Sequence, residues 1–355
     1  MRQVVLLGKP DTKRTHYLGR AAREAGLHVL FLDWDHWQEN LPKGRIFMKI
    51  DPPVWDSCSL EQLGSLIGDY QKQLEALSRF GRLQDVKFLN TPETIATLLD
   101  KRESKRRLAA AGLAVSEELK IVQEDVLEVE QLLDIMQKQR IHQVFIKPIC
   151  GSGAAGIAAF RWQPRTKQMV LYTCAWEVPD REDKKLNKLI NTKKLRRFTD
   201  SKQVLSMVER LLKLGCIVER WHAKAEYQGY SYDLRAVVQD GRMDFCLARL
   251  SKGPITNLHL NNHPLKLESL GLPQNVINDI EELCRQGMGC FSGLRSAGID
   301  ILLERGSWKP RIIEMNAQGD LLYQDIYGEN VIYQRQVEMM REEAYLVHGI
   351  QGKDR

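Results

Sequence analysis

The first 90 residues alternate short apolar runs with amphipathic helical patterns, and this alternation restricts the fold more than any other feature of the chain. We expect strands at residues 4–8, 28–34 and 86–89 and helices at residues 17–26 and 60–80. Strands separated by helices pair in parallel through right-handed crossovers, so this segment predicts a parallel sheet. Ligands of such sheets bind beyond the carboxyl ends of the strands, which here are residues 8–12 and 34–37.

After residue 90 the chain becomes richer in strands. We expect helices at residues 92–111, 126–137, 201–214 and 273–290 and from about residue 330. We expect strands at residues 118–122, 143–148, 157–162, 169–176, 216–220, 233–239, 243–250, 299–303 and 311–314. Thr91 is the expected N-cap of the first helix, with Pro92 in its first turn, and Asp240-Gly241 predicts a hairpin. This organisation predicts three domains, at residues 1–90, 91–218 and 219–355.

Composition excludes several classes of protein. With 43% hydrophobic and 28% charged residues, the 355-residue chain has ordinary globular values. No apolar run approaches the roughly 18–20 residues of a membrane-spanning helix, and the N-terminal apolar run is too short for a secretion signal. Seven cysteines, an odd number without a CxxC pair, indicate free thiols in a reducing compartment. We therefore expect a cytoplasmic protein with no membrane partner.

The positive charge is concentrated in one segment. Residues 181–197 carry eight Lys or Arg against Glu182 and Asp183, and this excess of six equals the net charge of the whole chain. The segment is either a solvated basic loop or a patch that attracts an anionic partner. No nucleic-acid-binding motif accompanies it, so the sequence argues against nucleic acid as a partner.

Seven short polar elements follow one another along the chain, and their order is more informative than any one of them. They are Lys101 with Lys105; Lys147; Gly151, Ser152 and Gly153; Glu219, Arg220, Trp221 and His222 with Glu226; Arg235 with Arg249; Asn257; and Asp300 with Glu314 and Asn316. Lys101 and Lys105 share one helix face. Lys147 ends an apolar strand, where its ammonium group can be held at the mouth of a cleft.

The last element has the donor atoms of a magnesium site. Glu314 and Asn316 are two residues apart on a predicted strand, so their side chains face the same side. Asp300 lies on the preceding strand of a predicted hairpin, within cross-strand reach. Carboxylate and amide oxygens suit Mg²⁺, which nucleotide-dependent enzymes hold with one or two carboxylates together with phosphate oxygens.

In this order, the motifs resemble the ATP-grasp superfamily of carboxylate–amine ligases, and most closely the branches of D-alanine–D-alanine ligase and ribosomal-S6 glutamate ligase. The resemblance covers roughly residues 90–319. It implies an α/β protein with the ATP-grasp fold, including an α+β lid and an N-terminal domain built on a parallel sheet. The chain departs from the family at Asn261-Asn262, where two glycines are common. It departs again at Ala317-Gln318-Gly319, where a small residue, proline and glycine are expected.

The resemblance also implies a role for each element. The ATP phosphates would be held by Lys147 and by either Lys105 or Lys101, under a mobile loop of Gly151, Ser152 and Gly153. Adenine would pair with the strand of Glu219, Arg220, Trp221 and His222, and the ribose with Glu226. The reaction centre would contain Arg249, Arg235 and Asn257. Mg²⁺, or Mn²⁺ as a substitute, would bind Asp300, Glu314 and Asn316.

We therefore expect an ADP-forming ligase that activates a carboxylate as an acyl phosphate and joins it to the amine of an amino acid or peptide. Two alternatives stay open: a kinase of the same fold, which the basic segment would suit, and a nucleotide-binding module without turnover. Residues 34–37, from Trp34 to Trp37, are candidates for substrate selection unless they cap the core. The sequence leaves the substrates and the oligomeric state open, and a homodimer is compatible with it.

Overall fold

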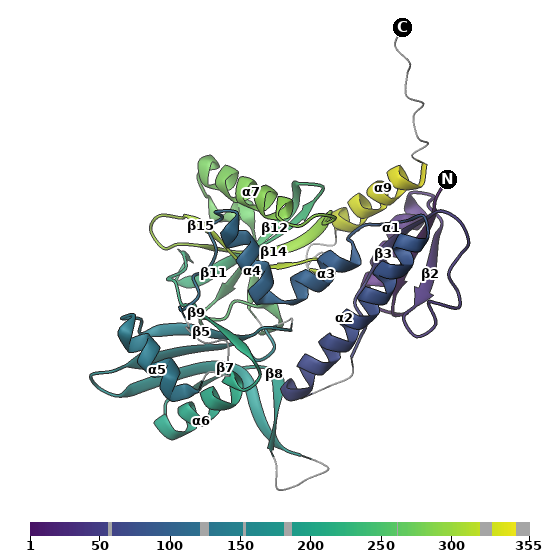
Figure 1. Cartoon of the computed structure of the whole chain (residues 1–355). Coiled ribbons are helices and arrows are strands. Elements are labelled where there is room, and N and C mark those ends of the chain that lie inside the picture. Colours follow the sequence, from purple (N-terminus) through teal and green to yellow (C-terminus); the bar gives the residue numbers. More distant parts are fainter. Residues whose placement is uncertain are drawn as a thin grey trace.

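Three β-sheets organise the chain, each with helices packed against it (Figure 1). The structure is a computed structural model that describes residues 1–55, 59–120, 128–151, 154–180, 187–260, 262–319 and 329–345. None of the helices in these ranges is long and apolar enough to span a bilayer. The six cysteines within the described ranges are free thiols, as expected.

The N-terminal sheet is parallel, as predicted, with the strand order β2-β1-β3-β4. Its strands are β1 (Gln3–Gly8), β2 (Val29–Asp33), β3 (Ile46–Ile50) and β4 (Val86–Phe88), and its helices are α1 (Lys13–Glu24) and α2 (Leu60–Leu83). Strand β3 was not expected from the sequence, because Lys49 interrupts its apolar run. The structure buries Lys49 in an ion pair with the Asp51 carboxylate, which compensates the charge.

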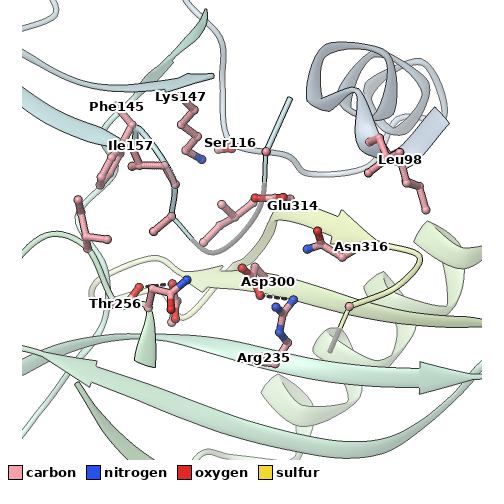
Figure 2. Close-up of a pocket in the computed structure, with 18 of the residues that line it drawn as sticks. Leu98, Ser116, Phe145, Lys147, Ile157, Arg235, Thr256, Asp300, Glu314 and Asn316 are labelled. Atoms are coloured by element: carbon pink, nitrogen blue, oxygen red, sulfur yellow. Dashed lines mark hydrogen bonds and ion pairs between the residues drawn. The ribbon is translucent and has the colours of Figure 1, made fainter. Parts of the chain in front are cut away.

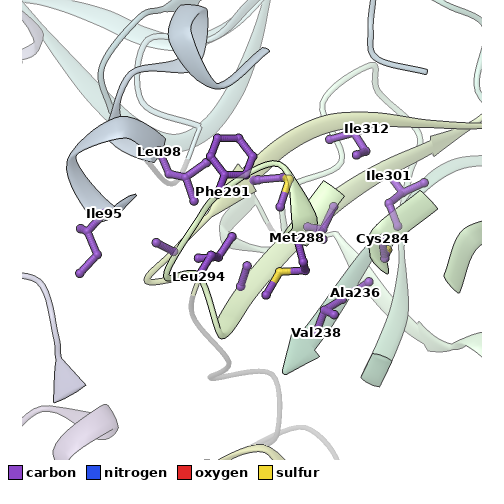
Figure 3. Close-up of a cluster of buried hydrophobic side chains, with 14 of the residues drawn as sticks. Ile95, Leu98, Ala236, Val238, Cys284, Met288, Phe291, Leu294, Ile301 and Ile312 are labelled. Atoms are coloured by element: carbon purple, nitrogen blue, oxygen red, sulfur yellow. The ribbon is translucent and has the colours of Figure 1, made fainter. Parts of the chain in front are cut away.

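The helix predicted at residues 92–111 is instead two helices, α3 (Pro92–Leu99) and α4 (Lys101–Ala110). The chain turns at Asp100, whose side chain accepts hydrogen bonds from the backbone N–H groups of Arg102 and Glu103 and so caps α4. Thr91 caps α3 as expected. The α3 side chain of Leu98 belongs to a buried cluster with Phe291 (Figure 3), so this short helix is fixed against the C-terminal part of the chain.

The second sheet is antiparallel, with the order β8-β7-β6-β5-β9. Its strands are β5 (Gln143–Pro148), β6 (Ala158–Gln163), β7 (Gln168–Pro179), β8 (Asn187–Phe198) and β9 (Cys216–Arg220), and its helices are α5 (Val129–Lys138) and α6 (Ser201–Leu212). Most of the basic segment is therefore an edge strand rather than a loop, and residues 181–186 lie outside the described ranges. Basic residues suit an edge strand because their side chains stay in solvent.

The third sheet is also antiparallel, with the order β13-β12-β11-β14-β15 and β10 paired with β11. Its strands are β10 (Glu226–Tyr227), β11 (Tyr230–Gln239), β12 (Arg242–Ser251), β13 (His263–Lys266), β14 (Ser296–Leu303) and β15 (Pro310–Asn316). The 3₁₀ turns η1 (Leu258–Leu260) and η2 (Leu267–Leu270) and the helices α7 (Gln274–Gly289) and α9 (Val331–Tyr345) complete the chain. The hairpin predicted at Asp240-Gly241 is confirmed, with φ of 47° and 78° at its two residues.

Helix α2 connects the first sheet to the second. Its Tyr70, Leu74 and Leu77 lie in the core shared by the first and third sheets. Its first residue, Leu60, belongs to a different core, whose other members lie between residues 119 and 218. Glu61 accepts hydrogen bonds from the Leu189 backbone N–H on β8 and from Arg210, each at 3.0 Å. The domain boundaries expected at residues 90 and 218 stay a prediction.

Candidate functional site

A cavity of about 490 Å³ lies where side chains from the second and third sheets meet those of α2 and α3, together with Arg14, Pro52 and Trp55 from the N-terminal part of the chain. Fifteen of the residues singled out by the sequence pattern belong to the described part of the chain and can be placed relative to it. Those that line it are Lys147, Gly151, Glu219, Arg220, His222, Arg235, Arg249, Asn257, Asp300, Glu314 and Asn316. Those that do not line it are Lys101, Lys105, Trp221 and Glu226. Ser152 and Gly153 lie outside the described residues.

The register of the third sheet brings charged residues face to face on the floor of the cavity. Asp233 on β11 is paired with Arg249 on β12. Arg235, two residues further along β11, is paired with Asp300 on β14, and Asp300 is in turn paired with Glu314 on β15. Because side chains two residues apart on a strand share a face, these five charged side chains form one row on the same face of the sheet.

Asp300 is the centre of this row (Figure 2). Arg235 Nη1 lies 2.8 Å from one of its carboxylate oxygens, and Arg249 Nη2 lies 3.1 Å from the other. Glu314 faces it across the strand pair and also lies 3.5 Å from Lys101 Nζ. Two of the carboxylates that line the cavity, Asp300 and Glu314, therefore lie close to three cationic side chains.

These two carboxylates and the amide of Asn316 are oxygen donors of the kind that Mg²⁺ prefers. Among the described residues, no group of three or more His, Cys, Asp or Glu side chains could hold a metal ion. A cation at this place would therefore depend on the Asn316 oxygen and on oxygens of a bound ligand. The donor set fits Mg²⁺ that is shared with phosphate groups, and it does not fit zinc, which prefers nitrogen and sulfur ligands.

Asp233 is the most buried carboxylate of the row, and it holds Arg249 in place. Its Oδ1 accepts a hydrogen bond of 2.7 Å from Arg249 Nε, while Lys224 Nζ lies 3.3 Å from its Oδ2 and Thr256 also bonds to it. Burial alone would raise the pKa of Asp233, but Arg249 and Lys224 outweigh it and hold that pKa at about 2. Asp233 has no role in the expectations drawn from the sequence, since a single buried carboxylate has no local signature.

A second charged cluster lies on the wall formed by β5 and β9. Glu219 Oε2 accepts hydrogen bonds from Lys147 Nζ at 2.6 Å and from the Ser116 hydroxyl at 2.9 Å, and Glu219 Oε1 pairs with Lys105. Burial would raise the pKa of Glu219, but the two ammonium groups hold it at about 2. Burial also lowers the pKa of Lys105. The side chain of Glu219 thus contacts Lys147 and Lys105, two of the three candidate phosphate lysines, and only the backbone of Glu219 is left for the expected pairing with adenine.

Lys101 and Lys105 take different positions, although they share one helix face. Lys101 Nζ bonds to the Gly151 carbonyl oxygen and lies near Glu314, whereas Lys105 bonds to Ser116 and Glu219. Lys105 therefore belongs to the cluster of Lys147, and Lys101 lies between the glycine turn and the candidate metal ligands. Which of the two would contact a phosphate stays a prediction.

One end of the cavity is apolar and lies between the second and third sheets. Its walls are Phe145 and Ile157 from the second sheet and Leu302 and Ile313 from the third. Trp221 does not reach the cavity, because its ring packs on Phe145 at 5.4 Å between ring centroids. Arg220 and His222, its neighbours on the chain, do reach it.

Glu226, the expected ribose ligand, lies outside the cavity and is half exposed. Its carboxylate pairs with Arg305, which belongs to the loop between β14 and β15. The structure therefore does not bring Glu226 together with the other site residues. Its assignment to the ribose stays a prediction that requires this ion pair to break.

The opposite end of the cavity is formed by α2 and α3. The residues that line it there are Trp55, Leu63, Ile67, Tyr70, Ile95 and Leu98. Gln318 joins this end to the candidate metal ligands, because its Nε2 donates to the Ile50 carbonyl at 2.9 Å and to the Tyr70 hydroxyl at 2.8 Å. The departure at residues 317–319 thus has a structural reason: Gln318 bridges the turn after Asn316 to the N-terminal sheet.

The expectation that Trp34 and Trp37 select a substrate is wrong for this structure, because both belong to the core. Trp34 Nε1 donates to the Asp51 carbonyl at 2.8 Å, and its ring meets Tyr70 edge to face at 5.5 Å. Trp37 packs in the same way on Phe80 at 6.1 Å. Both rings are about 5% exposed and neither lines the cavity. Sequence reasoning missed Tyr70, whose helical spacing on α2 is typical of an ordinary core residue, and Trp55, which lies before α2.

Comparison with known proteins identifies the fold. No protein-family model matches the sequence, and no curated protein matches it. Among solved structures, the macrocyclase MdnC bound with precursor peptide MdnA from Microcystis aeruginosa MRC is 13% identical, with a TM-score of 0.59 and coverage of 96% of this chain and 100% of that one. The ATP-grasp ligase PsnB complexed with precursor peptide PsnA2 and AMPPNP is 14% identical, with a TM-score of 0.58 and coverage of 96% and 98%.

The D-alanine–D-alanine ligase from Bacillus anthracis is 10% identical to the chain, with a TM-score of 0.55 and coverage of 97% of each chain. These likenesses extend over nearly the whole of every chain compared. The protein therefore has the ATP-grasp fold with an N-terminal parallel sheet, as expected from the order of its motifs. At such low identity the likeness establishes the fold alone.

Proposed function

We propose that the protein is an ADP-forming ligase that uses ATP and Mg²⁺ to activate a carboxylate as an acyl phosphate and then joins it to an amine. The observation that carries this proposal is that Lys147, Arg249 and the oxygen donors Asp300, Glu314 and Asn316 line one cavity. A site that separates a lysine-rich wall from a pair of carboxylates suits a polyphosphate bridged to a divalent cation.

The nucleotide would occupy the end of the cavity between the second and third sheets. Adenine suits the apolar walls of Phe145, Ile157 and Leu302, and the phosphates would extend toward Lys147. Glu219 neutralises Lys147 and Lys105 in the absence of nucleotide, since it bonds to both. The phosphates would share Lys147 and Lys105 with Glu219. Because Glu219 bonds to both lysines, it would hold them in place when the nucleotide binds.

Mg²⁺ would be held by Asp300, Glu314 and Asn316, where it would neutralise phosphate charge. Arg249 has a fixed orientation, because Asp233 holds its Nε and Asp300 its Nη2. A guanidinium held in this way can stabilise the charge that develops on the transferred phosphoryl group and the acyl-phosphate oxygen without reorganising. Asn257 lines the same cavity, and its side-chain amide would donate to the same oxygens.

The solved structures support the chemistry and the kinds of partner. PsnB has been solved with AMPPNP and a precursor peptide, and also with a minimal precursor, Mg and ADP. DcsG, a D-cycloserine synthetase, is 12% identical to the chain with a TM-score of 0.58. We therefore propose carboxylate and amine substrates that are small molecules or peptides.

A hydroxylamine trap tests the proposal. Hydroxylamine intercepts an acyl phosphate, so the purified protein with Mg·ATP and a panel of amino acids and short peptides should give ADP and a hydroxamate in equal amounts. Arg249→Lys keeps the charge but loses the two-pronged hydrogen bonding, and should slow hydroxamate formation by about 10²–10³-fold. Arg242→Lys on the same strand is the control, because Arg242 is exposed and pairs only locally with Asp244.

Two results would contradict the proposal. A phosphorylated product formed in equal amount to ADP, with no hydroxamate, would show a kinase acting on a hydroxyl. Equal hydroxamate yields from the wild type and Arg249→Lys would remove Arg249 from the reaction centre.

A further inference from the structure

The cavity has two apolar ends that lie on opposite sides of the oxygen donors. Figure 2 shows Phe145 and Ile157 on one side of Asp300 and Glu314, and Leu98 on the other. In the proposed function, the nucleotide base fills one such end. The other end, which we name the α2–α3 pocket, consists of Trp55, Leu63, Ile67, Tyr70, Ile95 and Leu98.

The side chains that form the α2–α3 pocket are held in place by the hydrophobic core. Ile95, Leu98 and Tyr70 are each at most 5% exposed and belong to the core that joins the first and third sheets (Figure 3). The Trp55 ring packs against Tyr70 with centroids 6.1 Å apart. A ligand group entering here meets aromatic and branched aliphatic carbon whose positions the core fixes.

Two of the polar groups at this end are hydrogen-bonded to each other. The Tyr70 hydroxyl and the Gln318 amide bond to each other, and Gln318 also bonds to the Ile50 carbonyl. A polar side chain placed in the pocket would lose its water without gaining these partners, at a cost of about 1–3 kcal/mol by the usual range for unpaired groups. Burial of an apolar side chain is favoured instead, by roughly 25 cal/mol per Å².

We propose that the acid activated by this protein carries a bulky apolar side chain, aromatic or branched aliphatic, which binds in the α2–α3 pocket while its carboxylate faces Arg249 and Asn257. This inference rests on the proposed ligase function and names its substrate class. Arg14 also lines the cavity, and its guanidinium would suit an acidic side chain. The main alternative is therefore a substrate acid with an acidic side chain. Glutamate is therefore the decisive comparison.

The first test is binding without turnover. L-phenylalanine, L-leucine, L-glutamate and glycine, each free and N-acetylated, are titrated into the full chain with the non-hydrolysable nucleotide AMPPNP and Mg²⁺. Phenylalanine and leucine should change the intrinsic fluorescence, and Trp55→Phe should remove most of that change. Preferential binding of glutamate, or a phenylalanine signal unchanged in Trp55→Phe, overturns the pocket assignment.

The second test is turnover with the hydroxylamine trap. Leu63→Trp fills part of the pocket and should raise the KM for phenylalanine by about 10-fold or more, within the range for a change of a methylene or two in an apolar site. The KM for ATP should change less than the KM for phenylalanine, because Leu63 lies beside the glycine turn at Gly151 but away from the apolar end proposed for adenine. Leu66→Trp is the matched control, since Leu66 lies on the same helix and does not line the cavity.

The two tests separate failure of the inference from failure of the proposed function. Binding of phenylalanine at Trp55 with no hydroxamate from any acid supports the pocket and overturns the ligase. Hydroxamate from glutamate and not from phenylalanine or leucine supports the ligase and overturns the pocket. An equal KM for phenylalanine in Leu63→Trp and Leu66→Trp also overturns the pocket.

Discussion

Lys147 and Glu219 bond to each other across neighbouring strands, with Lys147 Nζ 2.6 Å from Glu219 Oε2. In the register of β5 and β9, Glu219 is opposite Phe145, so Lys147 is its diagonal neighbour on the same face. Both side chains are less than a tenth exposed, and Lys105 bonds to the second oxygen of Glu219. One buried carboxylate therefore sets the positions of two buried ammonium groups. Changing the charge of any one of the three groups alters the stability of the other two.

Glu219→Gln should destabilise the protein by about 3–5 kcal/mol at pH 7, because it leaves Lys105 and Lys147 buried without their counter-ion. The pKa of Glu219 is about 2 in the folded protein against an ordinary value of 4.5. Its stabilising contribution is therefore complete above about pH 4.5 and is lost as the pH falls toward 2. The free energy of unfolding of the wild type and of Glu219→Gln is measured in urea from pH 7 to pH 3. The difference between the two proteins should be constant down to about pH 4.5 and should then become smaller.

Glu117→Gln is the control for that experiment, since Glu117 is half exposed and its ion pair with Arg220 is long, at 3.6 Å. Its effect should stay within about 0.5 kcal/mol at every pH. If the difference in free energy of unfolding between Glu219→Gln and the wild type grows below pH 4.5, the pKa of Glu219 is not lowered in the folded protein.

Lys147→Met should remove the stabilisation that Mg·ATP gives to the wild type. A ligand present at about 100 times its Kd raises the free energy of unfolding by roughly 2.7 kcal/mol. For Mg·ATP this increase is measured as a shift of the melting temperature. The variant should also be less stable without nucleotide, because Lys147 is only 5% exposed and Glu219 would lose one of its two cations. Lys138→Met, an exposed lysine on α5, should keep the full shift, and equal shifts in both variants would rule out a phosphate contact.

Glu314→Gln should raise the Mg²⁺ concentration needed for half-maximal ADP release by about 10-fold or more, because it removes one of two carboxylates from the candidate metal site. Glu304→Gln is the matched control, since Glu304 lies at the end of the same hairpin and pairs with Arg311. The measurement is a Mg²⁺ titration of turnover at saturating ATP. Identical midpoints for the two variants would place the cation elsewhere.

Glu61→Ala should loosen the contact between α2 and the second sheet. It removes the acceptor of the Leu189 N–H and the partner of Arg210. The amide of Leu189 should exchange with solvent faster, while amides of β1 and β3 keep their rates, because local opening affects only the segment that loses its contacts. The loss of global stability should be below about 1 kcal/mol, since this ion pair is partly exposed.

Glu75→Ala, also on α2, is the control for this exchange experiment. Glu75 pairs only with Arg79 one turn away, so its loss should leave the exchange of Leu189 unchanged. An unchanged rate in Glu61→Ala as well would show that the apolar contact of Leu60 is sufficient to hold the two parts together.

Much of the fold was predictable because its signals are local. The alternation of strand and helix predicts a parallel sheet, and β5 and β9 have the bounds read from their apolar runs. The hairpin of β14 and β15 is also local, so the pairing of Asp300 with Glu314 could be expected from a spacing of fourteen residues. Strands β8 and β3 were missed because lysines interrupt their apolar patterns. The helix expected at residues 92–111 is divided at Asp100, although the residues on both sides of Asp100 are helical.

By itself, the sequence determined the order of the elements, the parallel pairing of the first sheet and the set of oxygen donors at residues 300, 314 and 316. The tertiary structure alone decided how the cavity is closed. Glu219 meets lysines 72 and 114 residues away, and Gln318 meets Tyr70 across 248 residues. Such contacts depend on how three sheets pack and on which buried charges must find partners, and no local pattern of a chain encodes either.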